Sequence, residues 1–230
     1  MKVVTLENNR NEKINGILRN HNITQALIII CHGYASSYAH PALTAISTSL
    51  YERGRNVFSF NFSESAQTTA LKNQVSDILS IISYFKEFKK FILMGGSFGA
   101  LNASIATLES PKIKGLITVN GFFSTTHLGP NLLRIYLMFR SAALLPGIHK
   151  ETWKYMKKMH QPERINVPVL VIHSQDDKDV SIKQSQLFYE HLTSPKTFRK
   201  LKHANHNLSD KKSIDEVVQT IDTWMTSLKY

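Results

Sequence analysis

Short apolar runs alternate with longer amphipathic segments along most of the chain. The run Leu27–Cys31 has no polar position, as expected of a strand that is covered on both faces of a sheet. Helical spacing of apolar residues predicts helices over residues 41–53, 67–86, 98–109 and 181–192. This alternation is typical of an α/β protein with a mainly parallel sheet. The expected strands are Val3–Glu7, Lys13–Leu18, Leu27–Cys31, Asn56–Phe60, Phe91–Met94, Gly115–Val119, Val167–His173 and Lys196–Leu201.

The two ends of the chain carry local signals of their own. The polar turn NNRNE joins the first two expected strands and predicts an antiparallel hairpin. Near the C-terminus, Ser213 and Glu216 have the spacing of a capping box, which predicts that the last helix opens at this serine. The buried stripe of that helix is expected to consist of Val217, Ile221, Trp224 and Leu228.

One long segment interrupts the alternation. Residues 122–164 contain NLLRIYLMFRSAALLPGI and KETWKYMKKMH, which are both helix-like and are separated by a proline–glycine pair. An excursion of this length at the end of a strand predicts a helical cap over a site, although ordinary core helices are the alternative. We therefore expect a core formed by residues 1–121 and 165–230, with the cap of residues 122–164 inserted in it.

Composition limits the class of protein. A chain of 230 residues with 42% hydrophobic and 20% charged residues is long enough for one sizeable core. Cys31 is the single cysteine, so no internal disulfide can form. The sequence has no apolar stretch typical of a secretory signal or of a membrane span. These features predict a cytoplasmic protein without an integral membrane segment.

The formal net charge is +11 at pH 7, which raises the question of an acidic partner. The basic residues are spread along the chain, and no helix-turn-helix, zinc-ligand spacing or arginine-rich tract organises them. We expect a basic, solvated surface and no nucleic-acid partner.

The segment GGSFG follows the apolar run that ends at Met94 and precedes a helix-favouring stretch. A Gly-x-Ser-x-Gly pattern between a strand and a helix is the context of a nucleophile elbow, in which the serine sits on a strained turn. Gly95 and Gly99 let strand and helix approach closely, and a helix that starts at Phe98 directs free amides toward Ser97. A glycine-rich connection without a chemical role is the alternative.

A serine nucleophile of this kind also needs a second amide to hold an oxyanion. The residues HGYA follow the apolar run LIIIC, and Gly33 permits a sharp turn there. The amides of Tyr34 and Phe98 are therefore the expected oxyanion donors, and an ordinary turn at the strand end is the alternative.

A serine hydroxyl becomes reactive when a histidine takes its proton and a carboxylate orients that histidine. The segment SQDDKDVS follows a late strand and offers Asp176, Asp177 and Asp179. The segment KHANHNL follows the last strand and offers His203 and His206. Serine, aspartate and histidine thus occur in the required order, each just after a strand.

These segments resemble the α/β-hydrolase superfamily, particularly small serine esterases and serine-aminopeptidase-like hydrolases. The resemblance covers nearly the whole chain through LIIICHGY, GGSFGALNASIA, PVLVIHSQDDKDVS and KHANHNL. Relatives carry His-Gly-x-x-Asp-x-x-Val-Pro, which IHSQDDKDVS matches with serines for the glycine and the proline. The resemblance implies Asp177 as the triad acid, with Asp176 as second choice. It implies His206 as the base, with His203 as the alternative.

The same resemblance implies the α/β-hydrolase fold, which is a mostly parallel central sheet flanked by helices, here with a helical cap insertion. Relatives commonly have an aspartate and a glycine-containing loop after the fourth strand. This chain reads FNFSES at residues 60–65, without glycine, so the substrate contacts usual there do not carry over.

The expected function is that of a serine hydrolase that cleaves carboxylic esters through an acyl-enzyme. Ser97 is the expected nucleophile, His206 the base and Asp177 its partner, and Tyr34 and Phe98 supply the oxyanion amides. A peptidase, thioesterase or acyltransferase would use the same triad, and a non-catalytic binding module on this scaffold is a further alternative. The sequence has no dinucleotide fingerprint and no cluster at metal-ligand spacing, so we expect neither a cofactor nor a metal.

The cap is expected to set specificity for a small-molecule ester. Its apolar residues suit a pocket for an apolar acyl group, or alternatively pack as core: Leu132, Leu133, Ile135, Leu137, Met138, Phe139 and Leu144. Its basic residues outnumber its acidic ones and predict a preference for an anionic substrate group: Arg134, Arg140, Lys150, Lys154, Lys157 and Lys158.

Overall fold

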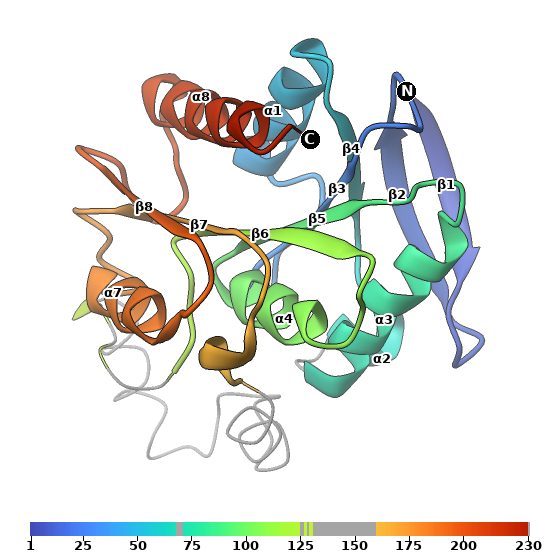
Figure 1. The fold of residues 1–230 in the computed structure, drawn as a ribbon, viewed down its shortest axis with the longest axis horizontal. Coiled ribbons are helices and arrows are strands. Elements are labelled where there is room, and N and C mark those ends of the chain that lie inside the picture. Colours follow the sequence, from blue (N-terminus) through green and yellow to red (C-terminus); the bar gives the residue numbers. More distant parts are fainter. Residues whose placement is uncertain (68–70, 125–126, 128, 131–159, 230) are drawn as a thin grey trace.

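The computed structural model describes residues 1–67, 71–124, 127, 129–130 and 160–229 (Figure 1). The strands are β1 (Lys2–Glu7), β2 (Lys13–Arg19), β3 (Leu27–Cys31), β4 (Asn56–Phe60), β5 (Phe91–Gly96), β6 (Ile113–Val119), β7 (Val169–Ser174) and β8 (Lys196–Leu201). The helices are α1 (Pro41–Glu52), α2 (Glu64–Gln67), α3 (Leu71–Tyr84), α4 (Phe98–Thr107), α7 (Ile182–His191) and α8 (Lys211–Ser227), with a 3₁₀ turn η1 (Pro162–Arg164).

The described strands form one sheet in the order β1-β2-β4-β3-β5-β6-β7-β8. Strand β2 runs antiparallel to both of its neighbours, and all pairs from β4 through β8 are parallel. The expected opening hairpin and the mostly parallel sheet are therefore confirmed. Because parallel strands point the same way, the residues that follow β5, β6, β7 and β8 meet at one edge of the sheet.

Helices cover both faces of the sheet. Figure 1 shows α1 and α8 on one face, and α2, α3, α4 and α7 on the other. Along β3, Leu27, Ile29 and Cys31 belong to the core under the second group of helices, whereas Ile28 and Ile30 belong to the core under α1 and α8. Successive side chains of a strand point to opposite faces, which explains why this strand has no polar position.

Two expected helix starts are wrong. The helix expected from residue 67 is preceded by a helical stretch, α2, that already begins at Glu64, and the described part of α3 runs from Leu71. Helix α8 is capped by Asp210 rather than by Ser213. The Asp210 carboxylate accepts hydrogen bonds from the Ser213 backbone amide at 2.9 Å and from the Ser213 hydroxyl at 2.6 Å. A carboxylate that precedes the first turn satisfies an orphan amide and also complements the positive end of the helix.

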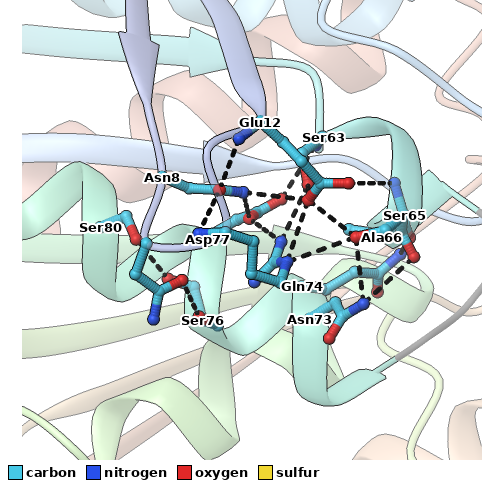
Figure 2. A network of polar contacts seen from close by, with 12 residues as sticks. Asn8, Glu12, Ser63, Ser65, Ala66, Asn73, Gln74, Ser76, Asp77 and Ser80 are labelled. Carbon is cyan, nitrogen blue, oxygen red and sulfur yellow. Dashed lines mark hydrogen bonds and ion pairs between the residues drawn. The ribbon is translucent and has the colours of Figure 1, made fainter.

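A polar network ties the β1–β2 hairpin to α3 and to the loop that follows β4 (Figure 2). The fully buried Asp77 carboxylate accepts hydrogen bonds from Asn8 Nδ2 at 2.7 Å and from the Ser63 amide at 2.9 Å, and it pairs with Arg10 at 2.5 Å. Glu12 accepts the Ser65 hydroxyl at 2.7 Å. A buried carboxylate is stable only when it is paired and hydrogen-bonded in this way, so the network holds the loop after β4 in one position.

Most of the expected cap, together with the apolar and basic residues assigned to it between Leu132 and Lys158, lies outside the described residues. Its first residues are anchored by α7, because Gln184 Oε1 accepts the amides of Phe123 at 2.7 Å and Ser124 at 3.0 Å. The division into core and cap stays a prediction. Of the helices in the described ranges, none combines the length and apolar character needed to cross a lipid bilayer.

Candidate active site

The expected site residues lie on loops at the carboxyl edge of the sheet. Ser97 follows β5, Asp177 follows β7, and His206 lies between β8 and α8. Strands β5, β6, β7 and β8 are consecutive neighbours in the sheet. The topology therefore gathers residues that are far apart in the sequence into one place.

Ser97 sits on a sharp turn between β5 and α4. Its backbone has φ 51° and ψ −123°, a conformation that residues with a side chain rarely adopt. A side chain at Gly95 would collide with the backbone of Gly99 and Ala100, and one at Gly99 would collide with the backbone of Cys31. The two glycines are thus required for the close approach of strand and helix that holds this turn, which is the geometry of a nucleophile elbow.

Backbone hydrogen bonds hold the elbow against β6. The Ser97 amide donates to the Val119 carbonyl at 3.0 Å, and the Ser97 carbonyl accepts the amides of Ala100 and Phe122, both at 3.0 Å. The Ser97 amide is therefore committed to the sheet. Any amide that holds an oxyanion has to come from another residue.

The structure brings Ser97, Asp177 and His206 into one hydrogen-bonded chain. His206 Nε2 lies 3.0 Å from Ser97 Oγ, and His206 Nδ1 lies 2.7 Å from Asp177 Oδ2. Because a carboxylate only accepts, Nδ1 carries the proton and Nε2 is left to accept the serine hydroxyl. This arrangement suits transfer of the serine proton to the histidine.

The alternative acid and base lie elsewhere. The side chains of His203 and Asp176 are 87% and 61% exposed, and their charged atoms are 4.0 Å apart on the surface. By contrast, the Asp177 carboxylate is buried and the His206 ring is mostly buried. Of these four residues, His206 is hydrogen-bonded to Ser97, and Asp177 is hydrogen-bonded to His206.

Asp177 remains ionised although it is buried. Burial by itself raises its pKa, but hydrogen bonds from His173 and His206 outweigh this effect, and the pKa is held well below the ordinary value. The second carboxylate oxygen accepts the amides of Asp179 at 2.8 Å and Val180 at 2.9 Å. The acid thus offers a negative charge to His206 near neutral pH.

His173 supports Asp177 from within the sheet and was not expected as a site residue. It is fully buried on β7, its Nε2 lies 3.5 Å from the Asp177 carboxylate and 3.0 Å from the Val180 carbonyl, and its Nδ1 lies 2.7 Å from Ser185 Oγ. The carbonyl only accepts, so Nε2 carries a proton that faces the carboxylate as well. The signal in the sequence was the histidine of the family segment His-Gly-x-x-Asp-x-x-Val-Pro.

Asn120 joins the end of β7, which leads to Asp177, to the loop that carries His206, and it was also missed. It follows β6 with φ 49° and is buried. Its Nδ2 donates to the His206 carbonyl at 2.9 Å, and its Oδ1 accepts the Ser174 amide at 2.8 Å. Asparagine is one of the few residues that tolerates this backbone region, and its position just after a strand of the site edge was the available signal.

The expected oxyanion amides lie around the elbow. The Phe98 amide is the first of α4 and has no acceptor among the described residues, as is usual at a helix start. A Cβ added to Gly33 would lie 3.1 Å from Ser97 Cβ and 3.6 Å from Ser97 Oγ, so the turn that precedes Tyr34 packs directly against the serine. Both expected donors therefore belong to segments that touch Ser97.

One group among the described residues has metal-ligand spacing. The candidate ligand atoms of Asp177, Asp179 and His206 lie within 4.8 Å of one another. Because Asp177 and His206 are hydrogen-bonded to each other, an ion bound there would take the place of the proton between them. The three residues can therefore either transfer a proton or bind a metal ion, but they cannot do both at once.

A comparison with known protein families identifies the family of this chain. The prolyl oligopeptidase family matches residues 49–228, which span more than half of the chain. The chain belongs to the prolyl oligopeptidase family. The match includes Ser97, Asp177 and His206, and its members share the α/β-hydrolase fold expected from the sequence. The protein is therefore a serine hydrolase of that fold.

Solved structures agree on the fold. Est1E from Butyrivibrio proteoclasticus is 18% identical with a TM-score of 0.75, and the alignment covers 99% of this chain and 98% of that one. The esterase domain of a Rhodothermus marinus protein is 24% identical with a TM-score of 0.75, covering 97% of each chain. The Pyrococcus furiosus esterase Pf2001 is 20% identical with a TM-score of 0.75, covering 98% of this chain and 92% of that one. No curated protein sequence matches the chain at a significant level.

Proposed function

We propose that the protein is a carboxylic ester hydrolase that acts through an acyl-enzyme on Ser97. The observation that carries the proposal is the hydrogen-bonded chain from Ser97 Oγ through His206 to Asp177, with distances of 3.0 and 2.7 Å. These hydrogen bonds link nucleophile, base and acid in the order that proton transfer requires, and the nucleophile sits on a strained elbow. These are the features that activate a serine hydroxyl.

In the first half of the reaction, Ser97 Oγ attacks the carbonyl carbon of the ester and its proton passes to His206 Nε2. The tetrahedral intermediate then expels the alcohol, which takes that proton from His206, and the acyl group remains on Ser97. In the second half, His206 takes a proton from a water molecule that attacks the acyl carbon. Collapse of the second intermediate returns the proton to Ser97 Oγ and releases the carboxylic acid.

Two groups act on charge during these steps. The Asp177 carboxylate holds the Nδ1 proton of His206 and stabilises the imidazolium that forms when Nε2 is protonated. The amides of Tyr34 and Phe98 are proposed to hold the oxyanion, since the Ser97 amide already donates to Val119. Two preorganised donors in such a position supply a large part of the rate enhancement.

An ester substrate is supported by the structural neighbours, which include esterases, and by a structure of Est1E that holds ferulic acid. An apolar acyl group, and an anionic group that faces the basic residues of the segment 122–164, stay predictions of the sequence.

A cytoplasmic location is supported by the lone cysteine, Cys31, which is buried and free.

The test is hydrolysis of short-chain p-nitrophenyl esters by the wild-type protein and by Ser97→Ala. Removal of the nucleophile should lower kcat by about 10³- to 10⁶-fold. A fluorophosphonate probe should label the wild-type protein at Ser97 and leave the variant unlabelled. Equal rates for the two proteins would contradict the mechanism, and failure of the probe to react would favour a non-catalytic binding module on this scaffold.

Peptide-bond cleavage is a second candidate, and the family match favours it because the family is named for an oligopeptidase. A thioesterase or an acyltransferase would use the same residues. Matched p-nitrophenyl ester, thioester and aminoacyl p-nitroanilide substrates separate these activities. A value of kcat/KM higher for the anilides than for the esters would replace the ester assignment with a peptidase.

A further inference from the structure

A cavity of about 350 Å³ lies along the loop that leads from β3 to the expected oxyanion donor. Its wall consists of residues 32–37, together with Asn61 after β4 and Gln74 on α3. Gly33 is shared between the cavity wall and the site, because its Cα faces Ser97 closely enough that an added Cβ would lie 3.1 Å from Ser97 Cβ. The cavity therefore adjoins the nucleophile. Its volume falls within the usual range for a small ligand.

The lining of this cavity is polar but uncharged. Apart from Tyr34, its side chains are an imidazole, two serine hydroxyls, two carboxamides and the methyl group of Ala35. Among the residues that the structure describes, the wall has no carboxylate, ammonium or guanidinium group and no aliphatic side chain larger than alanine. Burial lowers the pKa of His32, so its ring is neutral near pH 7. Such a wall offers an ion no charged partner and offers a polar neutral group several hydrogen-bonding partners.

Three polar groups of the wall have no hydrogen-bond partner within the described part of the chain. His32 Nδ1 donates to the Gly33 carbonyl at 2.8 Å, which leaves Nε2 as an acceptor on a residue that is only 6% exposed. The amide nitrogen of Asn61 is a donor, because its oxygen is the atom that accepts the Tyr38 amide at 2.9 Å. The Ser36 hydroxyl can donate or accept.

Hydrogen bonds hold Asn61 and Gln74 in the cavity wall. The backbone amide of Asn61 donates to the Asn15 carbonyl at 2.9 Å, and Ser63 in the same loop is fixed by the network around Asp77 in Figure 2. The side-chain nitrogen of Gln74 donates to the Ala66 carbonyl at 2.8 Å, and its side-chain oxygen accepts a hydrogen bond from Asn102 Nδ2 at 2.6 Å. Both ends of the carboxamide are therefore fixed in the cavity wall. Preorganised donors and acceptors bind a ligand group at a lower entropic cost.

We propose that this cavity is a subsite for a neutral, hydroxyl-bearing group of the ester, an inference that rests on the proposed ester hydrolysis. A hydroxyl group donates one hydrogen bond and accepts others, which matches an imidazole acceptor beside amide and hydroxyl donors. The hydroxyl belongs to the alcohol side or to the acyl side of the ester, and the two are distinguished by experiment. The protein thus selects a hydroxylated ester over the corresponding alkyl ester.

The test compares ethyl propanoate with 2-hydroxyethyl propanoate, which adds a hydroxyl to the alcohol side, and with ethyl 3-hydroxypropanoate, which adds it to the acyl side. Values of kcat/KM are measured with the wild-type protein and divided by the rates of alkaline hydrolysis, which removes differences in intrinsic reactivity. One hydroxylated ester should exceed ethyl propanoate by about tenfold, as expected for one well-placed hydrogen bond. The ester that does so identifies the side of the scissile bond that the cavity serves.

Two variants assign the preference to the cavity. Ser36→Ala removes the hydroxyl, and Asn61→Asp keeps the oxygen that accepts the Tyr38 amide while it removes the nitrogen donor. Each should lower the ratio of hydroxylated to plain ester by about three- to tenfold. The matched control is Ser83→Ala, which removes an exposed serine hydroxyl on α3 and should leave the ratio as in the wild type.

Equal normalised rates for the three esters in the wild type would overturn the subsite while the ester hydrolase stands. A preference for the hydroxylated ester that neither cavity variant reduces would overturn it as well. A protein that hydrolyses none of the three esters would overturn the proposed function and, with it, the inference. The first and last of these results differ in whether ester is consumed, so the two failures are distinguishable.

Discussion

The contact between Asn120 and the histidine loop leads to a sharp prediction about catalysis. The substitution is Asn120→Gly, which removes the carboxamide and keeps a residue for which φ 49° is unstrained. Three partners lose hydrogen bonds, namely the buried Ser174 amide, the partly buried His206 carbonyl and, at 3.4 Å, the Asn205 carbonyl. The backbone of Asn120 still donates to the Ile172 carbonyl, so the end of β6 stays in the sheet.

The size of the effect follows from these contacts. A buried donor left without a partner costs about 1–3 kcal/mol, and a carbonyl that water can reach costs about 0.5–1.5 kcal/mol. The free energy of unfolding should therefore fall by about 1.5–4.5 kcal/mol. The same contacts set the position of His206 relative to Ser97, and a displacement of about 1 Å in such a group costs about 100-fold in rate. We expect kcat to fall by about 10- to 100-fold while KM changes by less than about threefold.

The assay measures kcat and KM on a p-nitrophenyl ester, together with the rate of fluorophosphonate labelling and urea unfolding. The matched control is Asn56→Ala at the other end of the sheet, where a buried carboxamide accepts the His21 amide at 2.8 Å and donates to the Asn22 carbonyl at 2.7 Å. This variant should lose similar stability but keep kcat. If both variants lower kcat equally for an equal loss of stability, Asn120 is a structural residue and the positioning argument is refuted.

The remaining predictions concern pH and metal ions. The hydrogen bond from the Ser65 hydroxyl is the largest cause that lowers the pKa of Glu12, from 4.5 to about 2, so its carboxylate stabilises the fold above pH 4.5. Urea unfolding should show Glu12→Gln to be less stable than wild type at pH 7, with a difference that shrinks as the pH falls from 4.5 toward 2; a constant difference would contradict this. Burial lowers the pKa of His160 from 6.5 to about 4, so wild-type stability should decline as the pH falls from 6.5 to 4, and His160→Phe should show less of that decline in the same assay. Zn²⁺ should inhibit ester hydrolysis by binding His206 and its neighbouring aspartates, EDTA should restore the activity, and Asp179→Asn should weaken the inhibition; unchanged inhibition in the variant would exclude that group as the metal site.

Much of the fold was predictable because its signals are local. A strand buried on both faces is apolar at every position, as in Leu27–Cys31, and an elbow needs glycines on either side of its serine, as at Gly95 and Gly99. The helix boundaries were less predictable. Asp210, rather than Ser213, caps α8 because the geometry of the preceding loop decides which side chain reaches the free amides.

For the site, too, the sequence predicted some features and left others to the tertiary structure. The order of Ser97, the aspartate run and the histidine pair along the chain was sufficient to expect a catalytic set, because each follows a strand and parallel strands end at one edge. The sequence alone did not decide between Asp176 and Asp177 or between His203 and His206, since neighbouring residues of a turn point in different directions. The tertiary structure decided this by burying one aspartate beside one imidazole and leaving the other pair in solvent.

By itself, then, the sequence determined the elements, the strained turn at Ser97 and the sheet edge where the chemistry lies, because each depends on residues close together in the chain. Only the tertiary structure decided that Asn120 clamps the His206 loop, that His173 faces Asp177, and that residues 32–37 and Asn61 enclose a polar cavity. Those relations depend on which strands become neighbours and on how their loops pack. No local pattern of residues encodes such distances.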